Sequence, residues 1–249
     1  MSWSFVGRQA AGNTVNGATT GTVTLPAGVQ GGDFIAVAIN NTTGGAATTC
    51  SVAGFTALSN QASGGGNAGH DKLWTGYRVA AGAPGSATSD STFAVTFGAN
   101  TWAEFDLIVI RSTAGAGTVT YTLHTQATYT AALPDATLSP APGAGDLTIF
   151  GYGGQNAALS GTELIATAPA GLANWPSPCP TLSGNGGVYG MGWGTGLTAP
   201  GGATCTVGTA ALATLDAMDF AIGVTEVAAA VRPVVLVVPQ AAVMQAANW

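Results

Sequence analysis

The sequence predicts an all-β protein: an antiparallel β-sandwich built from two repeat-related halves, followed by an extended C-terminal arm. Three observations predict it. Short runs of β-branched and aromatic residues alternate with Gly, Pro, Asn and Ser clusters. Helical periodicity is nearly absent, and several motifs recur in the same order in both halves. We assign residues 1–226 to the sandwich, with halves at about 20–112 and 118–226, and residues 227–249 to the arm.

Each predicted strand is a short run of β-forming residues that ends at turn-forming residues. In Phe93–Phe97, three large side chains alternate with small ones, which places the large ones on one sheet face. Asp33–Ile39 is an apolar run, as is typical of a core strand. In chain order the predicted strands are Gly21–Leu25, Asp33–Ile39, Lys72–Val79, Phe93–Phe97, Glu104–Arg111, Thr118–Leu123, Leu147–Tyr152, Val188–Trp193, Thr204–Val207 and Met218–Val224.

An internal repeat relates the two halves. The matched segments are Gly32–Val37 with Gly145–Phe150, Phe105–Ile110 with Met218–Gly223, Ala53–Phe55 with Ala170–Leu172, and Ala83–Gly85 with Ala199–Gly201. Their offsets of 113, 113, 117 and 116 residues vary only as loop insertions would. The link Ser112–Gly117 is short, which favours one continuous sandwich over two tandem sandwiches.

The last part of the chain has a different character. Pro233 and Pro239 bracket the β-rich run Val234–Val238, and proline is excluded from central strands. The segment is therefore interpreted as an extended arm that docks on a neighbouring subunit or on its own sandwich. The predicted assembly contacts of the arm are Arg232, Pro233, Val235, Val237, Pro239 and Trp249.

Charge is scarce in this chain. Charged residues make up 6% of it, against about 25% in an average domain, with five basic and eleven acidic side chains and a net charge of −6. Five scattered basic residues cannot follow a phosphate backbone, so nucleic acid is excluded as a partner. No apolar window is long enough to cross a membrane, and residues 1–8 do not resemble a signal peptide. Low charge suits a protein packed in an assembly, or it reflects compositional drift alone.

Metal and cofactor sites are not expected. The spacing of Cys50, Cys179 and Cys205 fits no zinc pattern, and His70 and His124 cannot form such a site by themselves. Buried thiols are the favoured interpretation, with a Cys179–Cys205 pair left open. We therefore predict neither a metal nor a cofactor.

Two aspartates occupy matching positions before apolar strands. Asp33 and Asp146 each follow glycine, and either a calcium ligand or an Asx-type turn fits this position. The occurrence of the aspartate in both halves favours the turn, in which the carboxylate accepts backbone N–H groups.

Two carboxylate pairs are candidates for catalysis. Glu104 and Asp106 lie on one face of a strand, and Asp216 and Asp219 form a second pair. Glycoside hydrolysis uses such pairs. Asp106 aligns with Asp219 in the repeat, so a structural role is favoured and no enzymatic activity is predicted.

Two tryptophans are predicted to lie in loops. Trp102 follows Asn100, and Trp175 precedes a Pro-Ser-Pro run. A flat indole ring beside amides suits stacking against a sugar. The alternative is a contact with the sandwich or with another subunit. Trp102, Trp175 and Asn100 are therefore the candidate glycan or interface residues.

A series of motifs resembles a family of virion proteins. Thr24–Ile39 carries the pattern Thr-Leu-Pro-Ala-Gly-Val-Gln-Gly-Gly-Asp-Phe-Ile-Ala-Val-Ala-Ile, and it is followed by Ala53–Thr56, Leu73–Ala80 and Ala83–Gly85. In this order the motifs resemble a jelly-roll-type minor tail protein of an actinobacterial siphophage, over about residues 20–225.

This resemblance implies a jelly-roll-like sandwich and a role without catalysis. We expect a minor tail protein at the tail or tail tip, assembled into the virion in the bacterial cytoplasm. Other virion proteins and further copies of the chain are the expected partners. Two alternatives stay open: a capsid decoration protein of the head, and a carbohydrate-binding adhesin for a host-surface glycan.

Overall fold

The computed structural model describes residues 3–9, 14–42, 48–62, 71–126, 136–155, 170–175, 187–197 and 216–227. Within these ranges the chain forms eleven strands and no helix, so the all-β prediction is confirmed. The strands are β1 (Trp3–Arg8), β2 (Thr14–Thr24), β3 (Phe34–Thr42), β4 (Cys50–Val52), β5 (Thr56–Ala62), β6 (Asp71–Val79), β7 (Thr92–Ser112), β8 (Ala116–Gln126), β9 (Leu147–Gln155), β10 (Gly187–Thr195) and β11 (Asp216–Glu226).

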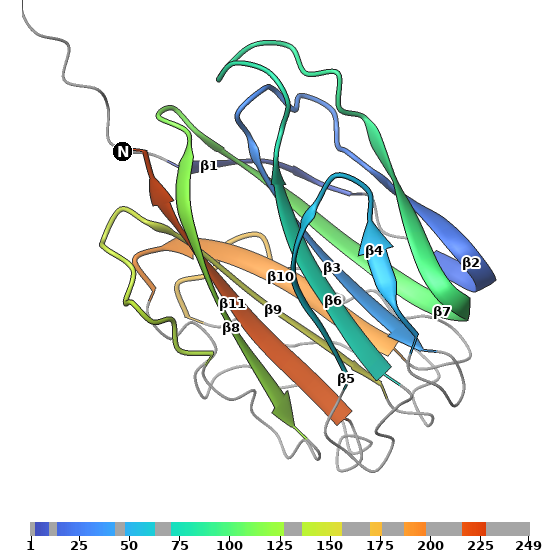
Figure 1. Cartoon of the computed structure of the whole chain (residues 1–249). Helices are drawn as coiled ribbons and strands as arrows, with labels where there is room; N and C mark the ends of the chain where they lie inside the picture. Colours follow the sequence, from blue (N-terminus) through green and yellow to red (C-terminus); the bar gives the residue numbers. More distant parts are fainter. Residues whose placement is uncertain are drawn as a thin grey trace, which may run out of the picture.

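The strands form two antiparallel sheets that pack together as a sandwich (Figure 1). The first sheet has the order β1-β7-β3-β6-β5, and β2 and β4 also pair with β7. The second has the order β10-β9-β11-β8. The predicted antiparallel sandwich is confirmed, whereas its jelly-roll connectivity remains a prediction. β1, β4 and β5 are strands that the sequence pattern missed.

The core between the sheets takes every second residue of the central strands. Phe34, Ala36 and Ala38 of β3 face the second sheet, because successive side chains of a strand point to opposite faces. The buried members of this inner core are Trp3, Phe34, Ala36, Ala38, Leu73, Ile108, Ile110, Leu147, Ile149, Met191, Met218, Phe220, Ile222 and Val224.

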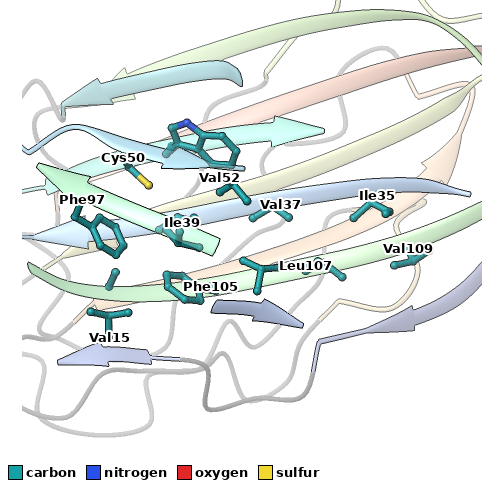
Figure 2. Packing of buried hydrophobic residues seen from close by; sticks show 14 of the residues in the cluster. Val15, Ile35, Val37, Ile39, Cys50, Val52, Phe97, Phe105, Leu107 and Val109 are labelled. Atoms are coloured by element: carbon teal, nitrogen blue, oxygen red, sulfur yellow. The ribbon is translucent and has the colours of Figure 1, made fainter. Parts of the chain in front are cut away.

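A second core lies on the other face of the first sheet. Ile35, Val37 and Ile39 of β3 point away from the second sheet and are fully buried. They are covered by the first half of β7 together with β4 and the end of β2, from which Val95, Phe97, Val52 and Val23 pack inward. Figure 2 shows this outer core, with Leu107 and Val109 of β7 beside the β3 side chains.

One strand contributes to both the central sheet and the outer layer. β7 is 21 residues long. Its second half pairs with β3, whereas Thr92–Thr96 pairs with the end of β2. β7 turns a corner between its two halves, where its pairing register with β2 shifts from Ala18↔Thr101 to Thr20↔Thr96. Gly17 has a φ of 66°, which favours glycine at this bend. The outer layer therefore adds a third tier to the sandwich.

The two sheets share an arrangement of strands. β3 lies between β6 and β7, and β9 lies between β10 and β11. The pair Thr56↔Tyr77 of the first sheet corresponds to the bridge Ala173↔Trp193 of the second. This correspondence is what a duplicated unit would produce, although the duplication itself stays a prediction.

The predicted alignment of Asp106 with Asp219 is wrong in the structure. Phe34 pairs with Ile110, so a constant offset of 113 residues would pair Leu147 with Gly223. Leu147 pairs with Val224 instead, and the register of the second sheet is therefore displaced by one residue. A slip of one residue moves a side chain to the opposite face. Asp106 consequently faces the second sheet, while Asp219 faces away from the first.

Several sequence predictions concern other parts of the chain. The strand Thr204–Val207, the cysteines Cys179 and Cys205, and residues 228–249 of the arm lie outside the described residues. The thiol of Cys50 is buried, as expected, and burial raises its pKa to about 12.

Truncation of adjacent residues in β7 tests whether the strand is buried on both faces. Leu107→Ala and Ile108→Ala are each expected to lower the free energy of unfolding by about 2–5 kcal/mol, because the two side chains fill different cores. The exposed substitution Thr96→Ala should change it by less than about 0.5 kcal/mol. Urea unfolding measures all three, and a cost below about 1 kcal/mol for Leu107→Ala would contradict the outer core.

Candidate functional site

An ion pair between half-buried Arg8 and buried Asp106 holds the edge strand β10 of the second sheet. Nε of Arg8 in β1 lies 3.4 Å from Oδ1 of Asp106 in β7. The backbone N–H of Met191 in β10 donates to Oδ2 of Asp106 at 2.9 Å, and Arg8 donates to the carbonyl of Met191. Arg8 also donates to the carbonyl of Asn174 at 2.8 Å. The ion pair thus satisfies both backbone groups that Met191 presents at the outer edge of its sheet.

The contacts of Asp106 are those of a structural residue. Burial raises the pKa of its carboxyl group, while Arg8 and the N–H of Met191 act in the opposite direction. Glu104 lies on the same face of β7, as predicted, and it is buried directly opposite Asn40 of β3. For the second predicted pair, the side chain of Asp216 is outside the described residues, and Asp219 is buried on the outer face.

The turn role predicted for Asp33 and Asp146 is confirmed. The N–H of Gln30 donates to Oδ2 of Asp33 at 2.8 Å, and the N–H of Gly143 donates to Oδ2 of Asp146 at 2.7 Å. Each carboxylate therefore closes the turn that enters the central strand of its sheet. Arg111 adds a bidentate contact to Asp33, with both distances 2.8 Å, and this hydrogen bonding raises the pKa of Arg111.

Trp175 packs against its own sheet. Its ring stacks on Phe150 at a centroid distance of 5.9 Å and on Tyr152 at 5.7 Å. Gly192 allows this approach, since a Cβ there would lie 2.8 Å from the indole. The neighbouring Asn174 accepts a hydrogen bond from Nε1 of Trp193 at 2.8 Å. This geometry matches the predicted alternative to sugar stacking, a loop tryptophan folded onto the sandwich.

The loop position predicted for Trp102 is wrong. Trp102 lies within β7, half-buried, and pairs with Asn16 of β2 and Thr42 of β3. The preceding Gly-Ala-Asn sequence suggests a turn, but pairing with β2 extends the strand through it. Asn100 is exposed at the corner of β7. The structure therefore brings Trp102 and Asn100 together on one strand and places Trp175 on the other sheet.

An open groove follows the bend of β2. It has a volume of about 310 Å³. Its walls combine hydroxyl and amide groups with apolar groups, and no charged residue lines it: Val15, Asn16, Ala18, Thr20, Gly21, Thr22 and Phe105. Within the described ranges, no three His, Cys, Asp or Glu side chains are grouped as metal ligands would be. No helix that could span a membrane is found in the same part of the chain.

In the described part of the chain, no charged side chain is fully exposed. Among the side chains that the structure describes, every charged one is buried or half-buried, and the exposed ones are mainly Thr, Ser, Ala, Gly and Asn. Arg8, Arg78 and Arg111 each pair with an aspartate of the same chain. The low charge of the sequence indicated a neutral surface, whereas nothing in the sequence indicated that the arginines are used internally.

A threonine face covers the outside of the third tier. We define it as Thr20, Thr22, Thr24, Thr92, Thr96 and Ser51, all of which are exposed. The register sets Thr20 and Ser51 on either side of Thr96, and Thr24 opposite Thr92. The face is uncharged, and it is the candidate interaction surface that the geometry defines best.

In comparisons with protein-family models, curated proteins and solved structures, nothing matches this chain.

The buried position of Asp106 has a consequence for stability against pH. Because burial raises its pKa, the folded chain holds this proton more tightly than the unfolded chain does. The contribution of Asp106 to the free energy of unfolding should therefore fall as pH rises from the ordinary value of 3.8 through the raised pKa. In the variant Asp106→Asn, the free energy of unfolding measured in urea should lack this decrease across the same pH range. An identical pH profile for wild type and variant would contradict the assignment.

Proposed function

We propose that the chain is a structural virion protein of a tailed bacteriophage, a minor tail protein that contributes to the tail or tail tip. The observation that carries the proposal is that none of the exposed side chains in the described ranges is charged. A soluble domain usually keeps about 25–35% charged residues on its surface, and a surface near neutrality promotes association. A protein that is covered by neighbours in an assembly has no need of that charge.

The motifs that resemble phage tail proteins support the same role through architecture. Thr24–Ile39 comprises the end of β2, the turn closed by Asp33, and most of β3. Leu73–Val79 lies in β6, which pairs with β3 along its whole length. These segments build the sandwich and supply no catalytic group. The proposed mechanism is therefore contact with other virion proteins and with further copies of the chain, without a cofactor or catalysis.

Two alternatives use the same fold. A capsid decoration protein of the phage head would need the same neutral contact surfaces. A carbohydrate-binding adhesin is favoured by the groove beside Asn16, which is the register partner of Trp102. Trp175 no longer supports that alternative, because its ring is stacked on Phe150 and Tyr152. Loss of host-glycan binding in Trp102→Ala, with Trp175→Ala as the comparison, would favour the adhesin.

Immunogold labelling of intact particles tests the proposed location. We expect antibody against the purified protein to label the tail or its tip. Label over the head would contradict the tail location and favour capsid decoration. Particles disrupted before labelling control for antibody access, and the absence of label from both preparations would overturn the virion role.

Truncation after Val227 separates folding from assembly. The change leaves β11 and the hydrogen bond from the N–H of Val227 to the carbonyl of Gly115 in place. We expect an unchanged melting temperature together with loss of incorporation into virions, since the removed segment carries the predicted arm contacts. Normal incorporation of the truncated chain, measured by immunoblot of purified particles, would contradict the docking role of the arm.

A further inference from the structure

β2 has one strand partner and one open edge in the described part of the chain. Its ladder runs along β7 alone, and it lies at the rim of the molecule in Figure 1. The N–H of Leu25 donates to the carbonyl of Ser91 in the chain entering β7, at 2.8 Å. Because backbone groups alternate in direction along an antiparallel strand, Val23 and Gly21 also face β7. Thr20, Thr22 and Thr24 therefore direct their N–H and C=O groups to the open edge.

Between the bulges at Asn16–Thr20 and Pro26, this edge lacks the features that usually prevent pairing. Natural edge strands carry charged residues or proline, or they bulge along their length. Thr14–Thr24 contains neither a charged residue nor a proline. The register shifts of β2 are confined to Asn16–Thr20, which leaves Thr20–Thr24 regular. Thr20, Thr22 and Thr24 are also exposed.

We propose that this edge pairs with the same edge of a second copy of the chain. The two strands run antiparallel, with Thr22 facing its own copy across a two-fold axis and Thr20 facing Thr24 of the second copy. Backbone hydrogen bonds between strands hold the pair, as in strand addition to other sheet edges. The outer layers of the two copies then form one continuous sheet.

The sequence of the edge favours a second copy as the occupant. Thr20-Gly21-Thr22-Val23-Thr24 places threonine against threonine at every outward position of the two-fold pair. A hydroxyl both donates and accepts hydrogen bonds, so facing threonines are complementary to each other. No charge on the threonine face opposes the contact. A two-fold interface of this kind closes on itself and leaves this edge of neither copy open.

A second copy of the chain is one partner in the proposed assembly, and the biological meaning of the dimer rests on that proposed function. Whether the dimer forms in solution is independent of the proposed function. A dimer without label on virions would remove the proposed function alone, and a monomer with label on the tail would remove this inference alone.

Sedimentation equilibrium of the full-length protein tests the pairing. Wild type is expected to be dimeric at micromolar concentration. Thr22→Lys places like charges opposite each other at the axis and should weaken the dimer by about 100-fold or more. Thr96→Lys is the matched control, because it adds the same charge to the same face but lies on β7, between β2 and β4. It should remain dimeric, and circular dichroism confirms that both variants fold.

Cross-linking locates the axis. In an antiparallel hydrogen-bonded pair, facing Cα atoms lie about 5.5 Å apart, which is within disulfide range. Thr22→Cys should therefore form a covalent dimer on oxidation, whereas Thr96→Cys and wild type with its native cysteines should not. A monomeric wild type, equal dissociation by both lysine variants, or equal cross-linking of both cysteine variants would overturn the edge-paired dimer.

Discussion

The central strands are apolar on both faces, and the rest of the fold follows from this constraint. All six side chains of Phe34–Ile39 are buried, and so are Leu107–Ile110 on β7. Burial of the Phe, Ile, Val and Leu side chains among them contributes about 1.5–3 kcal/mol each, so neither face can remain in water. The second sheet covers one face. The long bent strand β7 brings its own first half, with β2 and β4, over the other.

The scarcity of charge and the internal use of charge have one structural explanation. Asp33 closes the entry turn of β3 and draws Arg111 to it, and Asp90 binds Arg78. Asp106 binds Arg8 of its own sheet and the backbone N–H of Met191 in the second sheet. Each pair ties a turn, a loop or an edge to the sandwich. With only five basic residues in the chain, these ties leave few for the surface. The absence of charge from the exposed side chains that the structure describes therefore follows from how the fold is held together as well as from composition.

Local patterns predicted much of the architecture but not its long-range pairing. The alternation in Phe93–Phe97 and the aspartates before the apolar runs predicted a strand and two turns correctly. The corner of β7 was predicted as a loop, because Gly-Ala-Asn is a turn sequence and the pairing with β2 is not visible locally. The polar strand β5 has no clear alternation. The Arg8–Asp106 contact joins residues 98 positions apart in the sequence, so no local signal indicates it.

The edges of the two sheets are treated differently, and the difference bears on function. At β10 the backbone groups of Met191 are bound by Arg8 and Asp106, and Ala173 forms a bridge with Trp193. That edge is closed within the chain. At β2 the described residues contain no comparable device, and the side chains around the edge are uncharged hydroxyls. A fold that commits scarce charges to one edge directs association to its uncharged edges, of which β2 is one. This selectivity is what a subunit of an ordered assembly requires, since unrestricted edges lead to aggregation.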